Sequence, residues 1–271
     1  MSATRVGPYV VHEEIGRGGM AVVHRAIDER TGRTVALKRP LEGTLRDPQA
    51  LRQVFREVRL AARLRHPHVV ALLGAVEHEG GPCLVLEHVD GRALYDVLRD
   101  TGPLPLEDVL RVGTAIADAL AFIHAHGVVH QDVSTGNVLL AGGTVKLADF
   151  GLARLAGARV VTAGRSYELA GTPAYLAPEQ VLGHALDGRA DVFALGAVLY
   201  EAWTGRPAFT GATIDDVLEA VVAAAPVPCS ALRPETPPAL EAALSAALAR
   251  ERDARCDAAG LAELLAAVTR S

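Results

Sequence analysis

The stretch VHQDVSTGN at residues 129–137 is followed by DFG at residues 149–151 and by APE at residues 177–179. Each of these short patterns occurs by chance in unrelated proteins. The occurrence of all three in this order and at these spacings cannot reasonably be due to chance. This part of the chain therefore decides which fold and which chemistry we expect. Turn-forming residues interrupt it repeatedly, and we interpret residues 128–179 as a loop-rich segment.

Three side chains in this segment are suited to proton transfer and metal binding. The carboxylate of Asp132 is placed to accept a proton from a substrate hydroxyl group. Asn137 and Asp149 offer hard oxygen ligands, which suit the octahedral coordination of Mg²⁺. We therefore expect the three residues to form one site, with Asn137 and Asp149 as the metal ligands.

Near the N-terminus, a glycine-rich turn lies between two predicted strands, residues 9–16 and residues 21–27. Glycine has no Cβ atom, so backbone N–H groups in such a turn can approach phosphate oxygens closely. Turns of this kind are also common in ordinary hairpins. A strand rather than a helix follows the turn, which argues against a Rossmann dinucleotide site. The turn residues that we expect to bind phosphate are Gly16, Arg17, Gly18 and Gly19.

A lysine, Lys38, ends the next predicted strand, residues 33–38. A lysine in that position is usually a solvated edge residue. Here a predicted helix over residues 48–64 places Glu57 nineteen positions later (57 − 38), facing back towards the strand. Because a buried lysine needs a counter-charge, we expect Lys38 and Glu57 to pair and to hold the ammonium group against phosphate.

The predicted elements divide the chain into two parts. Short strands dominate the first part, which ends with strands at residues 69–77 and 83–87. Long helices dominate the second part, at residues 106–125, 191–204 and 238–249. We therefore predict a bilobal α+β fold. A small β-rich lobe with one main helix spans residues 1–87, and a larger, mainly helical lobe spans residues 88–271.

In these motifs the sequence resembles the protein-kinase superfamily, and most closely the bacterial Ser/Thr kinases of eukaryotic type. The resemblance runs from about Tyr9 to the last helix, and further matches are GTPAY at residues 171–175, Asp191 and Arg255. It implies the bilobal kinase fold and a Ser/Thr protein kinase that transfers the γ-phosphoryl group of ATP to protein hydroxyls. The implied cofactors are ATP and Mg²⁺, with Mn²⁺ as an alternative metal.

The resemblance also implies roles for individual residues. Lys38 and Glu57 position the phosphates, Asp132 orients the substrate hydroxyl, and Thr172 bonds to Asp132. Arg255 is expected to pair with Glu179, Asp191 to hold the backbone of the catalytic loop, and His130 to be a packed core residue under Phe150. The residues expected to contact the nucleotide outside the glycine-rich turn are Ile15, Val23, Ala36, Lys38, Glu87, Val89, Leu139 and Asp149.

Two residues of the catalytic loop depart from the family pattern. Gln131 stands where most members have an arginine that binds a phosphate on the activation loop, so a phosphate there is not expected to switch this chain through that contact. Ser134 stands where most Ser/Thr kinases have a lysine that neutralises the transferring phosphoryl group. Removing one such stabilising group costs on the order of 3 kcal/mol, roughly a hundredfold in rate.

Two other functions stay open from the sequence. The first is a pseudokinase that binds nucleotide and acts as a scaffold, which Gln131 and Ser134 favour and the intact Lys38, Asp132 and Asp149 oppose. The second is a small-molecule phosphotransferase, because the loop around Asp132 is similar to that of antibiotic and choline kinases. The GTPAY and APE segments argue against it, since in the family they form the protein-substrate platform.

Composition and charge limit the remaining classes. Half of the residues are hydrophobic, which indicates a folded globule, and the net charge of -5 gives no support to a nucleic-acid or membrane partner. The three cysteines show no metal-binding spacing. The N-terminus lacks a signal-peptide pattern, and the longest apolar stretch, residues 192–200, is far shorter than the roughly 20 residues of a membrane helix. We expect a cytoplasmic protein that binds ATP and a protein substrate, and that self-associates for autophosphorylation.

Overall fold

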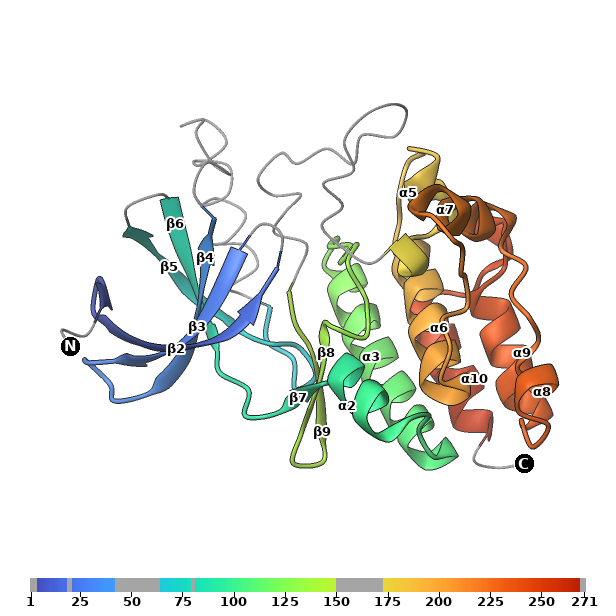
Figure 1. The fold of residues 1–271 in the computed structure, drawn as a ribbon, viewed down its shortest axis with the longest axis horizontal. Coiled ribbons are helices and arrows are strands. Elements are labelled where there is room, and N and C mark those ends of the chain that lie inside the picture. The colour runs from blue at the N-terminus through green and yellow to red at the C-terminus, as the bar shows by residue number, and fades with distance from the viewer. Residues whose placement is uncertain (1–3, 19–20, 42–63, 79–80, 150–172, 269–271) are drawn as a thin grey trace. The chain divides into compact units, whose positions relative to one another are not determined.

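The structure is a computed structural model of the 271-residue chain, and it describes residues 4–18, 21–41, 64–78, 81–149 and 173–268 (Figure 1). The described residues form two compact units, with the division between Asp90 and Gly91. We call them the N-terminal unit and the C-terminal unit. The predicted helix over residues 48–64 that contains Glu57 lies outside the described residues, except for Leu64.

The N-terminal unit contains a six-stranded antiparallel sheet with the strand order β1-β2-β3-β4-β6-β5. All five strands predicted from the sequence are present, with ends shifted by up to three residues, and the short β1 was not predicted. The bounds are β1 (Arg5–Val6), β2 (Tyr9–Arg17), β3 (Ala21–Asp28), β4 (Thr34–Pro40), β5 (Leu72–His78) and β6 (Gly81–Glu87).

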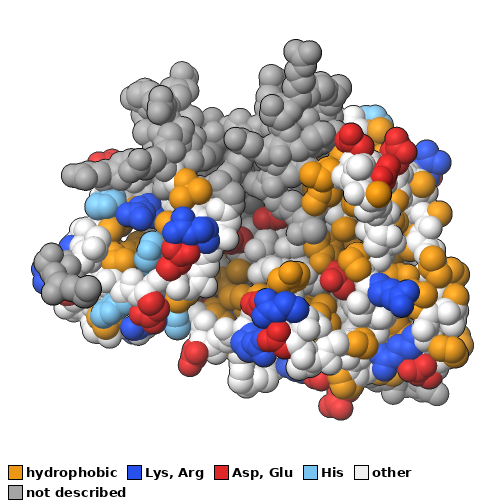
Figure 2. All heavy atoms as spheres, in the orientation of Figure 1, with side chains coloured by type: hydrophobic (Ala, Val, Ile, Leu, Met, Phe, Trp, Pro, Cys, Tyr) orange, Lys and Arg blue, Asp and Glu red, His pale blue; other side chains and the backbone are white. Residues whose placement is uncertain are grey.

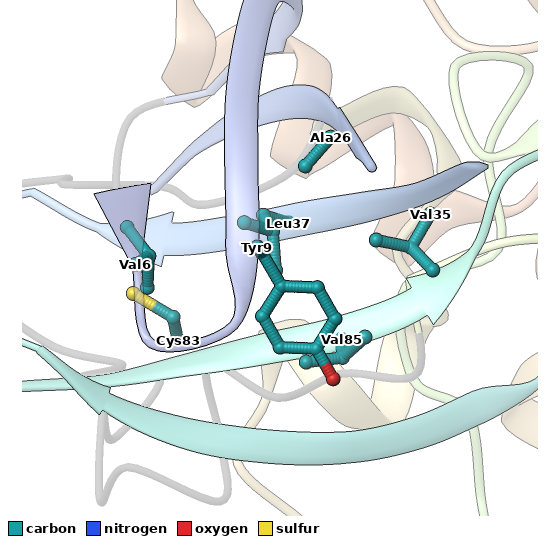
Figure 3. Close-up of a cluster of buried hydrophobic side chains, with 7 residues drawn as sticks. All are labelled: Val6, Tyr9, Ala26, Val35, Leu37, Cys83 and Val85. Carbon is teal, nitrogen blue, oxygen red and sulfur yellow. The ribbon is translucent and has the colours of Figure 1, made fainter. Parts of the chain in front are cut away.

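Side-chain alternation gives β4 two different faces. Val35 and Leu37 point into a buried apolar cluster, so Ala36 and Lys38 point to the opposite face of the sheet. Val23 on β3 pairs directly with Lys38 and therefore shares that second face. Figure 3 shows the cluster between the strands, and its members are Val6, Tyr9, Ala26, Val35, Leu37, Cys83 and Val85.

The C-terminal unit is mainly helical, as the sequence predicted, and it also contains a small three-stranded sheet that was not predicted. The strands are β7 (Arg92–Ala93), β8 (Val138–Ala141) and β9 (Thr144–Leu147). The helices are α2 (Leu94–Thr101), α3 (Leu106–Ala125), α5 (Pro178–Val181), α6 (Arg189–Thr204), α7 (Ile214–Ala223), α8 (Cys229–Leu232), α9 (Pro238–Ala247) and α10 (Ala258–Val268), with single 3-10 turns at Pro173–Tyr175 and Arg252–Ala254.

Three helices form the centre of this unit. Every residue from Asp191 to Tyr200 of α6 is buried, which confirms that its apolar stretch is a core helix. Gly113 on α3 permits close packing, because a Cβ atom there would lie only 2.7 Å from Leu265 Cδ1 of α10 and 2.9 Å from Leu199 Cδ1 of α6. The helix α3 has the bounds that its apolar periodicity predicted.

The segment at residues 128–179, which we predicted to be loop-rich, also contains two short strands that the sequence did not predict. β8 and β9 form a hairpin whose turn is Gly142 and Gly143, with φ angles of 52° and 89°. Two-residue hairpin turns of the primed types match the twist of the strands and require positive φ, which glycine adopts without strain. This hairpin connects Asn137 to Asp149, so it sets the spacing of two predicted site residues.

The surface of α2 has a compact group of ion pairs. Arg99 contacts Asp96 and Asp100, and Arg92 contacts Asp100 as well. Figure 2 shows basic and acidic side chains intermingled over this helix. Among the described residues, no helix combines the length and the apolar character needed to cross a bilayer.

Candidate active site

The predicted catalytic loop is held by a buried carboxylate of α6. Asp191 accepts hydrogen bonds from the backbone N–H of His130 at 2.7 Å and from that of Gln131 at 2.6 Å. Asp191 is only 1% exposed, so water does not compete for these bonds. The expectation that Asp191 holds the loop backbone is confirmed.

Two site residues have a backbone conformation that side chains disfavour. The φ angle is 68° at Gln131 and 58° at Asp149. For residues other than glycine this left-handed region costs roughly 1–2 kcal/mol, so surrounding contacts must maintain it. Such strain is concentrated at functional sites, and here it lies immediately before Asp132 and at the second predicted metal ligand.

Asn137 is bonded directly to Asp132. Its side-chain Nδ2 donates to the carbonyl oxygen of Asp132 at 2.8 Å and to the carboxylate Oδ2 at 2.9 Å. The backbone N–H of Asn137 donates to the carbonyl of Ser134 at 3.0 Å, which closes the loop. The structure therefore brings together the predicted proton acceptor and one predicted metal ligand.

The donor set fits a divalent cation. Because the Nδ2 atom of Asn137 is engaged by Asp132, the other polar atom of that amide is an oxygen. Asp149, at the end of the β8–β9 hairpin, contributes a carboxylate. Amide and carboxylate oxygens are the hard ligands that Mg²⁺ and Mn²⁺ take.

His130 is a structural residue, as expected. It is 1% exposed, and burial lowers the pKa of its imidazole. Its Nδ1 accepts the backbone N–H of Asp132 at 3.3 Å, and its Nε2 lies 3.1 Å from the carbonyl oxygen of Ala148, so the neutral ring donates through Nε2. The ring therefore connects Asp132 with the residue preceding Asp149. The expected partner Phe150 lies outside the described residues.

A second polar chain supports the middle of the loop. The hydroxyls of Thr135 and Tyr175 are 2.7 Å apart, and the Tyr175 hydroxyl donates to the carboxylate of Glu201. Burial raises the pKa of both Tyr175 and Glu201. The carbonyl of Thr135 also accepts the backbone N–H of Tyr95 on α2. These contacts fix the loop against three helical segments of the unit.

The predicted ion pair beneath the APE segment is present. Arg255 Nη1 and Nη2 lie 2.7 Å and 3.0 Å from the two carboxylate oxygens of Glu179. The Arg255 side chain is fully buried and also lies over the ring of Phe193, 4.8 Å from the ring centroid. The pair therefore anchors the short helix α5 to the core of the unit.

Sequence reasoning missed one residue of this site, Gln180 on α5. Its side chain contacts both Ala177 and the backbone of Gln131, which is 49 positions earlier in the chain. No motif or spacing in the sequence indicated that contact, because it depends on how α5 packs.

In the N-terminal unit, the predicted nucleotide residues Val23, Ala36 and Lys38 lie on one face of the sheet, and Gly16 pairs with Val23. Glu87 ends β6, and its carboxylate accepts the backbone N–H of Ala71 at 3.1 Å. Ile15, Arg17, Gly18 and Val89 belong to this unit, and Leu139 belongs to β8 of the other. Gly19, Glu57 and Thr172 lie outside the described residues.

Comparison with known proteins agrees with the family resemblance that the sequence motifs indicated. Residues 9–258 match the family model described as the protein kinase domain. The chain is 37% identical over 252 residues to the serine/threonine-protein kinase PknB of Mycobacterium tuberculosis, and this match covers 91% of the chain and 40% of PknB. The chain thus spans about two fifths of the length of the curated relatives that it matches.

Solved structures show the same fold. The kinase domain of PknI from Mycobacterium tuberculosis has a TM-score of 0.77 and 28% sequence identity, covering 99% of this chain and 98% of that one. A crystal structure of Rad53 in complex with AMP-PNP has a TM-score of 0.79 and 25% identity, covering 94% of this chain and 64% of that one. The predicted fold class is therefore confirmed.

Proposed function

Because this chain belongs to the protein kinase domain family, we propose that it is a Ser/Thr protein kinase that transfers the γ-phosphoryl group of ATP to hydroxyl groups of protein substrates. The observation that supports this most strongly is the pair of hydrogen bonds from Asn137 to Asp132. They orient a carboxylate beside an oxygen ligand, which is the arrangement that phosphoryl transfer to a hydroxyl needs.

In the proposed reaction Asp132 orients the substrate hydroxyl and accepts its proton. The hydroxyl oxygen forms a bond to the γ-phosphorus, the bond from that phosphorus to the β,γ-bridging oxygen breaks, and ADP leaves with the electron pair. The Asn137 bond to Oδ2 of Asp132 restricts the carboxylate to one orientation. Orientation of this kind is a large part of enzymatic rate enhancement.

The residues that the sequence assigned to nucleotide binding keep that role in the proposal. We propose that Lys38, paired with Glu57, holds the phosphates, and that the backbone of the turn around Gly16 and Gly18 covers them. Glu87 and Val89 would bind adenine through their backbone groups, with Ile15, Val23, Ala36 and Leu139 around the ring. Asn137 and Asp149 would hold Mg²⁺, or Mn²⁺ in its place, which neutralises phosphate charge when bound.

The rate is proposed to be lower than in relatives that have the usual lysine. Ser134 is 8% exposed and carries no charge, so it cannot neutralise the transferring group as an ammonium would. The protein substrate includes a second copy of the same chain, which would give autophosphorylation.

One experiment distinguishes protein substrates from small-molecule substrates. The purified chain is incubated with γ-labelled ATP and Mg²⁺, with a mixed library of Ser- and Thr-containing peptides in one reaction and with choline and aminoglycosides in another. The proposal predicts label in the peptides only. Label in the small molecules alone would overturn it in favour of a small-molecule phosphotransferase.

A further inference from the structure

We propose that Gln180 is a positioning residue that fixes the peptide group immediately before Asp132. The proposal rests on the proposed phosphoryl-transfer function, because it assigns Gln180 a role in that reaction through Asp132. Gln180 lies in the first turn of α5, one residue after Glu179, and it is 5% exposed.

Both polar atoms of the Gln180 side-chain amide form hydrogen bonds. Its Oε1 accepts the backbone N–H of Ala177 at 2.9 Å, and its Nε2 donates to the carbonyl oxygen of Gln131 at 3.2 Å. A backbone N–H can only donate and a carbonyl oxygen can only accept, so these two partners set the orientation of the amide. Gln180 thus connects the start of α5 to the catalytic loop.

The contacted carbonyl belongs to the peptide group that leads into Asp132. A peptide group is planar, so the carbonyl oxygen of Gln131 and the N–H of Asp132 move together. Gln180 bonds to the oxygen of this plane, and the Nδ1 of His130 accepts the N–H on its other edge. The plane is therefore held from both edges.

The same contact supports the strained conformation of Gln131. Asp191 bonds to the N–H groups of His130 and Gln131, and Gln180 bonds to the Gln131 carbonyl. With φ at 68°, Gln131 would relax if these bonds were lost. Relaxation would rotate the following peptide plane and displace the Asp132 carboxylate from its substrate.

The start of α5, from which the Gln180 side chain extends, is held by a buried ion pair. Glu179, adjacent to Gln180, is held by the fully buried Arg255. The Gln180 side chain extends from this point, so it holds the peptide group before Asp132 in a fixed position relative to α5. Both partners of the Gln180 side chain are uncharged backbone groups, so the uncharged amide is sufficient to bond to both of them.

The test uses Gln180→Glu, which retains the acceptor for Ala177 but replaces the donor to Gln131 by a second acceptor. Gln180→Met removes both. The control is Glu241→Gln in α9, where a side chain also accepts backbone N–H groups, from Cys229 at 3.0 Å and Ser230 at 2.7 Å, outside the catalytic loop. For each protein kcat and the KM for ATP are measured, with amide hydrogen exchange of the peptide that includes Gln131 and Asp132.

We expect Gln180→Glu at pH 8 to lower kcat by about tenfold, equivalent to ~1.4 kcal/mol, with the KM for ATP unchanged within about twofold. Exchange at Gln131 and Asp132 should become faster. As the pH falls to 6, the ratio of its kcat to that of the wild type should rise, because a protonated carboxyl donates to the Gln131 carbonyl again. Glu241→Gln should show none of these changes.

Unchanged kcat and unchanged exchange in Gln180→Glu would overturn the proposal. If the wild type transferred no phosphoryl group, the proposed function would fail, while the exchange measurement would still decide whether Gln180 holds the peptide. If Gln180→Met does not fold, the decision rests on Gln180→Glu, which preserves the helix-terminal bond to Ala177.

Discussion

Asn137 donates its side-chain amide to the carboxylate of Asp132 at 2.9 Å, and to the carbonyl oxygen of the same residue at 2.8 Å. One amide nitrogen therefore fixes both the side chain and the backbone of the proposed proton acceptor. The residues are five positions apart, and the loop between them is closed by the bond from Asn137 N–H to Ser134.

Replacing Asn137 by Ala is expected to lower kcat by about 10- to 100-fold. A hydrogen bond to a charged group is worth about 1.5–3 kcal/mol, and each ~1.4 kcal/mol is tenfold in rate. The measurement is the initial rate of peptide phosphorylation at saturating ATP. The exposed Thr144, at the turn of the β8–β9 hairpin, gives a control variant, Thr144→Ala, which should keep the wild-type rate. Equal rates for both variants would refute the role of Asn137.

Replacing Arg255 by Gln is expected to destabilise the fold by about 3–5 kcal/mol, because it leaves the buried Glu179 carboxylate without its partner. Urea unfolding followed by circular dichroism measures this loss. Arg99→Gln provides the matched control, since Arg99 is half-exposed and pairs with Asp96 and Asp100 at the surface. Its effect should be far smaller, and a comparable loss from both variants would contradict this account.

The regular elements of the fold could be predicted because their patterns are local. The helix α3 has an apolar periodicity that continues through all its turns, and the predicted and observed bounds agree. The β8–β9 hairpin was missed because each strand has only four residues and lies among loop motifs. The adjacent glycines 142 and 143 were the available signal.

Stability should depend on pH through Glu201. Burial raises the pKa of Glu201 in the folded state above its ordinary value of 4.5. Between 4.5 and that raised value the folded chain binds more protons than the unfolded chain, so this residue's contribution to stability falls as the pH rises through that window. Above the window the contribution is constant.

Glu201→Gln removes this titration while retaining an oxygen that can accept the Tyr175 hydroxyl. Relative to the wild type, the variant should therefore gain stability as the pH rises from 4.5 to the raised pKa of Glu201, and the difference should stay constant above that pKa. Unfolding free energies of the two proteins across this range give the comparison. A difference that is independent of pH would show that Glu201 does not titrate as proposed.

Ser134→Lys is expected to raise kcat, by up to roughly a hundredfold, if the missing ammonium group limits the rate. Ser134→Thr keeps the hydroxyl and adds no charge, so it should leave kcat near the wild-type value. The two variants are compared at saturating ATP and peptide. A Ser134→Lys protein that remains folded and is no faster would show that this chain does not depend on a charge at that position.

The candidate site was predictable where its residues have a chemical signature. Asp132, Asn137 and Asp149 were predicted as site residues from motif order, and the bonds of Asp191 and Arg255 were correctly expected from the family resemblance. Gln180 was not identified, because an amide that bonds to a backbone carbonyl leaves no pattern in the chain. Such contacts depend on tertiary packing, and only the structure shows them.

The most direct test of the central claim is the intact mass of the purified chain after incubation with ATP and Mg²⁺, measured beside Asp132→Asn, with the thermal stabilisation of both proteins by ATP. The account predicts that both bind ATP and that only the wild type gains the mass of phosphate. If neither protein gains mass while ATP stabilises both, the proposed phosphoryl transfer is contradicted, and a nucleotide-binding scaffold is the better interpretation of this chain.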